Sequence, residues 1–163
     1  MRMRLVLIAS LVWLGSVSVS AADDPPANYV AGFLGTTVGY RPPGGSFDGW
    51  QKDATVLLGY GRFVTPKLAL ELDIGPTYVS GDYVSTGLVP GLVWAFSPHA
   101  YAAARFIVSV DPERRFTLFP GIGLSHTFKG RITPILELNL SSTRSGGKSD
   151  FGVAVTGGVL IAF

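Results

Sequence analysis

The sequence predicts a closed eight-stranded antiparallel up-and-down transmembrane β-barrel. Three observations carry this prediction: a first segment with the features of a secretory signal, alternation of apolar and polar residues along most of the remaining chain, and four evenly spaced phenylalanines, the first three of which are followed by turn residues. The alternation has the period of two that a β-strand with unlike faces requires. No later segment shows the spacing of an amphipathic helix, so the chain after the first segment is expected to be all strand.

Residues 1–21 are expected to be a cleaved signal peptide. The segment begins with two arginines, continues with an apolar stretch and ends on small residues. This order is typical of secretory signals, and the apolar stretch is shorter than the ~20 residues of a membrane-spanning helix. Residues 22–28 are then a short periplasmic lead-in, and residues 29–163 form the barrel. Export to the bacterial outer membrane is the localisation that follows.

Composition excludes several classes of function. The 163 residues contain no Cys and only two His, which excludes disulfide frameworks, thiolate metal sites and a cysteine nucleophile. No metal or other cofactor is expected. The formal net charge of +2 disappears when the two arginines of the signal segment are removed. Without a basic stripe the chain has no electrostatic support for binding nucleic acid.

Eight segments of the chain alternate as strands do. The clearest is Leu68–Ile74, in which leucines and Ile74 share one face while Ala69, Glu71 and Asp73 share the other. The expected strands are 29–40, 52–63, 68–79, 86–96, 100–110, 116–127, 131–141 and 150–163. Each is long enough for a tilted membrane crossing of ~9–11 residues.

Four prolines fall inside these expected strands: Pro76, Pro90, Pro120 and Pro134. Because proline has no N–H to donate to a strand ladder, each is expected at a β-bulge or a bend. The alternative is that the strand boundaries are misplaced.

Phe63, Phe96, Phe128 and Phe163 recur every 32 to 35 residues. This is the spacing of a repeated two-strand hairpin with an aromatic residue at the same depth each time. Taking the four as one face collects most leucines and isoleucines on that face. The opposite face collects many Gly and Ala together with the charged residues Arg62, Glu71, Asp73, Arg105 and Glu137. A second aromatic girdle is expected at the other rim, formed by Tyr40, Phe47, Trp50, Tyr78 and Tyr83.

The apolar face is expected to meet lipid. A soluble barrel would carry charges along the exterior of every strand, whereas here few charges lie in strand middles, among small residues that suit a narrow interior. Charges in such a lumen must pair, and a sheet in lipid must close to satisfy its backbone. Leu70 and Leu138 should therefore lie outside, and Glu71 and Glu137 inside. A soluble periplasmic barrel that binds a small apolar ligand is the alternative fold-level interpretation.

With these features the chain resembles the bacterial eight-stranded outer-membrane barrels of the OmpA-like and OmpX-like family over residues 29–163. The resemblance rests on the signal segment, the hairpin spacing, the stretch Gly59–Leu72 and the terminal Phe163. It implies that Phe163 is part of the signal read by the barrel-assembly machinery. It also implies a monomer with both termini in the periplasm. The peptidoglycan-binding domain that follows some barrels of this family is not expected here.

The expected function is structural or surface-interacting: envelope integrity, with lipopolysaccharide or host contact. Basic residues near the expected outer rim suit lipopolysaccharide phosphates; they are Arg41, Arg114, Arg115, Arg144 and Lys148. A first alternative is a narrow gated pore whose interior charges exchange partners.

A second alternative is an enzyme that removes acyl chains from lipid A, suggested by the adjacent Ser125 and His126. Neighbouring residues on a strand point to opposite faces, so these two side chains cannot share a hydrogen bond. The protein is therefore not expected to be an enzyme.

Overall fold

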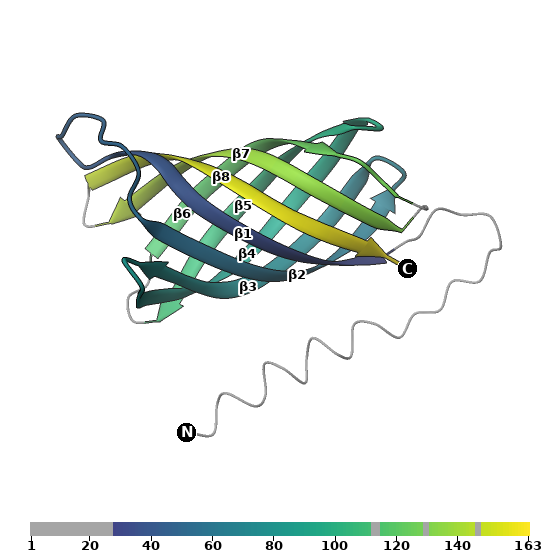
Figure 1. The fold of residues 1–163 in the computed structure, drawn as a ribbon, viewed down its shortest axis with the longest axis horizontal. Helices are drawn as coiled ribbons and strands as arrows, with labels where there is room; N and C mark the ends of the chain where they lie inside the picture. The colour runs from purple at the N-terminus through teal and green to yellow at the C-terminus, as the bar shows by residue number, and fades with distance from the viewer. Residues whose placement is uncertain (1–27, 112–114, 129–130, 146–147) are drawn as a thin grey trace, which may run out of the picture.

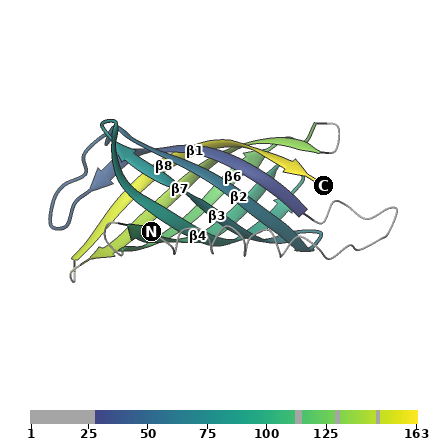
Figure 2. The same cartoon turned by 90° about the horizontal axis from the view of Figure 1, so that it is seen from below.

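The computed structural model describes residues 28–111, 115–128, 131–145 and 148–163. They form eight antiparallel strands that close into one barrel, with each strand paired to its neighbours in sequence and β8 paired to β1 (Figure 1, Figure 2). The strands are β1 (Asn28–Arg41), β2 (Asp53–Thr65), β3 (Leu68–Val79), β4 (Asp82–Ser97), β5 (Ala100–Asp111), β6 (Arg115–Ser125), β7 (Ile132–Ser145) and β8 (Lys148–Ala162). The predicted fold class is confirmed. The expected signal peptide lies outside the described residues.

The two ends of the barrel differ in their connections. β1 begins and β8 ends at one end, here called the terminal end, where the backbones of Asn28 and Phe163 exchange hydrogen bonds (Figure 1). The opposite, or loop, end carries the longest connection, residues 42–52. It also carries the β3–β4 turn, in which Ser80 and Gly81 both have positive φ, 53° and 93°. Positive φ at both central residues is what a two-residue type I′ hairpin turn requires, and this tight turn lets β4 start at Asp82, four residues earlier than expected.

The outer face of the barrel is apolar and its inner face is polar at mid-height. Leu70 and Leu138 are 50% and 47% exposed, whereas Glu71 and Glu137 are 6% and 3% exposed. A soluble barrel would require the reverse arrangement, so that alternative is rejected. Exposed aromatic side chains occur toward both ends: Phe47, Trp50, Tyr83, Phe116 and Phe151 at the loop end, and Trp94, Phe96, Phe128 and Phe163 at the terminal end.

The predicted facing of β2 is wrong. Phe63 and Leu57 line the lumen, while Val56 and Leu58 are exposed. Phe63 packs against the ring of Tyr29, with 5.5 Å between ring centroids. Arg62 therefore lies on the outer face, where it pairs with exposed Leu70, and is not part of an interior charge network. The alternation in β2 predicts the wrong facing because this strand carries large apolar residues on both of its faces.

The strand prolines interrupt pairing on one side without shifting the register of the interrupted ladder. Pro76, Pro90 and Pro120 each pair with a neighbouring strand on one side and fall in a gap of the ladder on the other side. The register is the same before and after each gap. Pro134 lies near the start of β7, just beyond the residues that pair with β6. The β3–β4 ladder shifts register between Thr77 and Tyr78, beside Pro76, whereas no register shift falls at Pro90, Pro120 or Pro134. Among these prolines of the described strands, the expected bulge is therefore found beside Pro76 alone.

Within the described part of the chain, no helix is long and apolar enough to span a membrane.

Candidate functional site

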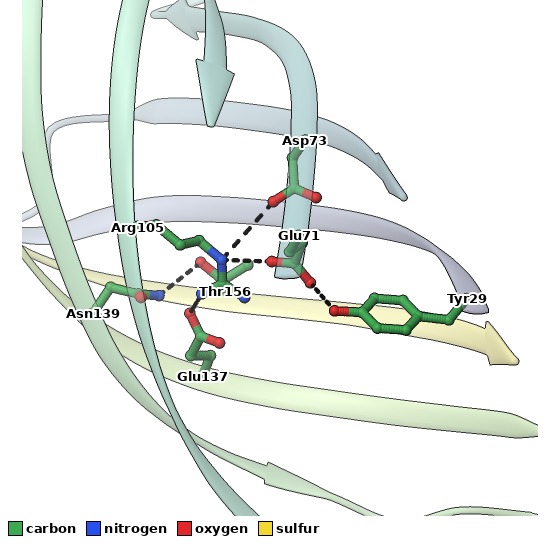
Figure 3. Close-up of polar contacts among 7 residues, drawn as sticks. All are labelled: Tyr29, Glu71, Asp73, Arg105, Glu137, Asn139 and Thr156. Carbon is green, nitrogen blue, oxygen red and sulfur yellow. Dashed lines mark hydrogen bonds and ion pairs between the residues drawn. The ribbon is translucent and has the colours of Figure 1, made fainter. Parts of the chain in front are cut away.

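Arg105 lies at mid-height in the lumen and is surrounded by acidic side chains (Figure 3). Its Nε lies 2.7 Å from Oε1 of Glu71 and 3.8 Å from Oδ2 of Asp73. Its Nη1 lies 2.5 Å from Oε1 of Glu137. The guanidinium also stands over the ring of Phe33, 5.7 Å from the centroid. These contacts join β3, β5 and β7 to β1 across the lumen.

Further polar side chains extend this arrangement. The Tyr29 hydroxyl donates to Oε2 of Glu71 at 2.9 Å, and Nδ2 of Asn139 donates to the Thr156 hydroxyl at 3.2 Å (Figure 3). We call the whole set the central layer: Tyr29, Glu71, Asp73, Arg105, Glu137, Asn139 and Thr156. All seven are at most 8% exposed.

Strand periodicity brings the central layer together. Glu71 and Asp73 are two residues apart on β3, and Glu137 and Asn139 are two apart on β7, so each pair faces the lumen. The neighbouring strands place glycines opposite the large side chains. A Cβ added to Gly61 would overlap the Tyr29 ring, and one added to Gly59 would overlap the Asp73 carboxylate. Small residues on β2 therefore make the space that Tyr29 of β1 and Asp73 of β3 occupy.

The central layer carries more acidic than basic groups. Three carboxylates share one guanidinium, and neither oxygen of Asp73 accepts a hydrogen bond from the protein. Buried charges are costly unless they are paired, so the geometry depends on Arg105 holding several carboxylates at once. Among the described residues, no three His, Asp or Glu side chains are arranged to hold a metal ion.

Two of the cavities formed by the described residues lie in the lumen. The terminal cavity, about 450 Å³, reaches Glu71 and Arg105 and is lined mostly by apolar side chains. The loop-end cavity, about 310 Å³, reaches Thr156, and its lining combines apolar side chains with many hydroxyl groups and with Asp53, Arg115 and Asp150. Asp53 accepts hydrogen bonds from the backbone N–H and hydroxyl of Thr37. The central layer therefore stands between these two cavities, and the loop-end cavity is the more polar of the two.

The basic residues expected to contact lipopolysaccharide are spread along the loop end. Arg41 ends β1, Arg115 begins β6, Arg144 lies near the end of β7 and Lys148 begins β8. All four are exposed, and Arg115 also borders the loop-end cavity. Arg114 lies outside the described residues.

The residues that suggested an enzyme do not form a catalytic pair. Ser125 borders the terminal cavity inside the barrel. His126 is exposed and stacks on His99, with 5.6 Å between ring centroids, and it meets the ring of Phe128 edge-on. No described contact joins the serine to an imidazole.

Comparison with solved structures finds membrane barrels. Ail, the attachment invasion locus protein of Yersinia pestis, aligns with a TM-score of 0.50 at 9% identity, over 83% of this chain and 99% of Ail. At this identity the likeness concerns the fold alone. The fold is that of a transmembrane β-barrel.

Two further solved structures align more loosely. A de novo designed transmembrane β-barrel aligns with a TM-score of 0.47 at 15% identity, over 85% of this chain and 99% of the design. The outer membrane protein OprG from Pseudomonas aeruginosa aligns with a TM-score of 0.43 at 10% identity, over 85% of this chain and 97% of OprG. No protein-family model and no curated protein sequence matches the chain.

Sequence reasoning missed Tyr29 and the depth of Asn139. The lumen-facing position of Tyr29 could have been predicted from the sequence, because Tyr29 begins the alternation Tyr29, Ala31, Phe33 that faces the lumen in β1. The sequence does not show which individual side chains meet across the lumen, because those contacts depend on the register of all eight strands.

Proposed function

We propose that the protein is a small barrel of the bacterial outer membrane with a structural role in the envelope, akin to the OmpA-like and OmpX-like group. The observation that carries the proposal is the pairing of an apolar exterior with a central layer of charges closed off from solvent. Leu58, Ile122 and Leu124 are more than 60% exposed, which is costly in water and favourable in lipid. Arg105, at 4% exposure, occupies the lumen at mid-height.

The terminal end is proposed to face the periplasm and the loop end the exterior. A signal-directed chain that starts in the periplasm and crosses eight times also ends there. Outer-membrane barrels carry their short turns on the periplasmic side, and the longest connection of this barrel is at the other end. Phe163, 60% exposed at the terminal end, suits the proposed role in recognition by the barrel-assembly machinery.

Fractionation tests this proposal. We expect the protein in the outer-membrane fraction, with a gel mobility that changes on boiling because the closed barrel resists detergent until heated. A protein that is recovered as soluble periplasmic material, with the same mobility before and after boiling, would contradict it.

The loop end is proposed to contact lipopolysaccharide phosphates through Arg144 and Lys148. We expect the double charge reversal Arg144→Glu with Lys148→Glu to remove most of the stabilisation that lipopolysaccharide adds over phosphatidylcholine, about 1 kcal/mol per basic residue. Thermal unfolding in vesicles of the two compositions measures it. Lys67→Glu, an exposed reversal at the terminal end, is the control and should change nothing. Equal effects of both reversals would refute specific contact.

A second candidate is a narrow gated pore, favoured by the two cavities that flank the central layer. Asp73 lies 3.8 Å from Arg105, beyond its closest partner, and offers an alternative partner for the guanidinium. A pore predicts single-channel currents in planar bilayers that change in Glu137→Gln. If neither the wild type nor the variant produces currents in planar bilayers, the pore is contradicted and the structural role is the remaining proposal.

A further inference from the structure

The terminal cavity is a compartment that the structural role does not use. Its apolar walls include the side chains of Tyr29, Phe33, Phe63, Val93, Ile135 and Leu160. Turn residues Pro66 and Pro98 line it as well, which places its mouth at the terminal end. Lys67 at the mouth is exposed, so solvent screens its charge. A volume of about 450 Å³ with mainly apolar lining is typical of sites for small organic molecules.

The floor of the terminal cavity is acidic. Glu71 and Arg105 line it directly, and Asp73 and Glu137 lie against the same guanidinium (Figure 3). Three carboxyl groups face one guanidinium here, so the acidic groups outnumber the basic one. Side chains shield this region from water, where an added positive charge interacts strongly with carboxylates.

Aromatic rings flank this floor. Tyr29 and Phe63 pack at a tilt with 5.5 Å between centroids, and Tyr101 brings its ring and hydroxyl to the same cavity. Aromatic faces attract both flat apolar groups and cations. The shape and the charge of the cavity thus favour a flat apolar body that ends in a protonated amine.

We propose that the terminal cavity binds small aromatic amines that enter from the terminal end. The ring of the ligand lies between Phe63, Val93 and Ile135, and its ammonium group points toward Glu71. Ligand binding is a further property beyond the proposed structural role. If the barrel binds no amine, the proposed structural role still stands.

Three probes of the same size and different charge test the proposal: 2-phenylethylamine, 2-phenylethanol and phenylacetate. Full-length mature protein is placed in phosphatidylcholine nanodiscs, and the methyl NMR signals of Val93, Ile135 and Leu160 are followed during titration. The lipid-facing methyl groups of Leu92, Leu136 and Val159 report partitioning of the probe into the bilayer. We expect saturable shifts confined to the cavity methyl groups, with the amine binding about tenfold or more tightly than the acid because of the excess carboxylates.

A matched pair of variants separates the cavity from the bilayer. Ala95→Trp places an indole in the cavity, whereas Ala104→Trp adds the same bulk to the lipid face of β5. Ala95→Trp should abolish the saturable shifts and Ala104→Trp should preserve them. The proposal is overturned if no saturable shift occurs, if Ala95→Trp leaves the shifts unchanged in a folded barrel, or if the alcohol or acid binds as tightly as the amine.

Discussion

Arg105 holds three acidic side chains in a space that water hardly reaches. Its partners sit on two strands, β3 and β7, so one residue links opposite parts of the wall. In a buried cluster the loss of one partner leaves the remaining charges unpaired, which costs more than the pair itself contributes. The removal of the single cation is therefore more damaging than the removal of any one carboxylate.

We expect Arg105→Ala to lower the free energy of unfolding by about 3–5 kcal/mol, because Glu71, Asp73 and Glu137 lose their shared counter-charge. Urea titration in lipid vesicles, followed by tryptophan fluorescence, measures the change. Arg62→Ala is the matched control: it removes the same side chain from the outer face and should cost less than ~1 kcal/mol. Equal losses for the two variants would show that the central layer contributes no special stability.

Two glycines of β2, Gly59 and Gly61, make room for side chains of the central layer. Gly61→Ala should destabilise the barrel by about 1–3 kcal/mol, since the new methyl group overlaps the Tyr29 ring. Gly157→Ala, where an added Cβ meets nothing within 4 Å, should be close to neutral in the same urea titration. A neutral Gly61→Ala would mean that Tyr29 is not held where the structure places it.

Individual strands differed in how well their sequences predicted them. β3 was unambiguous, because its leucines alternate with Glu71 and Asp73 and only one facing keeps those charges out of lipid. β2 was ambiguous, because Leu57 and Phe63 on the inner face are as apolar as Val56 and Leu58 on the outer face. The true signal in β2 was Gly59 and Gly61, whose missing side chains leave space for residues of other strands. Such space becomes visible only when the partner strands are in place.

The prolines show that this barrel tolerates gaps in its ladders. Pro120→Ala should leave the free energy of unfolding within ~1 kcal/mol, since the ladder is already interrupted there on one side. Leu138→Pro, on the same outer face but at a fully paired position, should cost about 3 kcal/mol or more. Hydrogen exchange of the β6 and β7 amides locates the change. If both substitutions had equal effects, the gaps would have no role in accommodating proline.

The whole barrel is layered along its axis: the terminal cavity, the central layer and the more polar loop-end cavity. The sequence predicted the closure, the strand number and the burial of acidic residues from β3 and β7, because alternation and composition determine the facing of single strands. Pairing among the interior charges, Arg105, Glu71 and Glu137 included, was expected, but the two cavities and the central position of Arg105 among the three carboxylates were not. Those depend on the stagger between strands, which no local pattern encodes.

Nitroxide labels on Leu70→Cys and Leu138→Cys, in a chain without other cysteines, test the lipid-facing exterior most directly. In bilayers, we expect both labels to collide readily with oxygen, which concentrates in lipid, and to be shielded from a water-soluble nickel chelate. A label on Gly49→Cys in the loop-end connection should show the opposite preference. Labels at Leu70 and Leu138 that the nickel chelate reaches as easily as the loop label would contradict a transmembrane barrel.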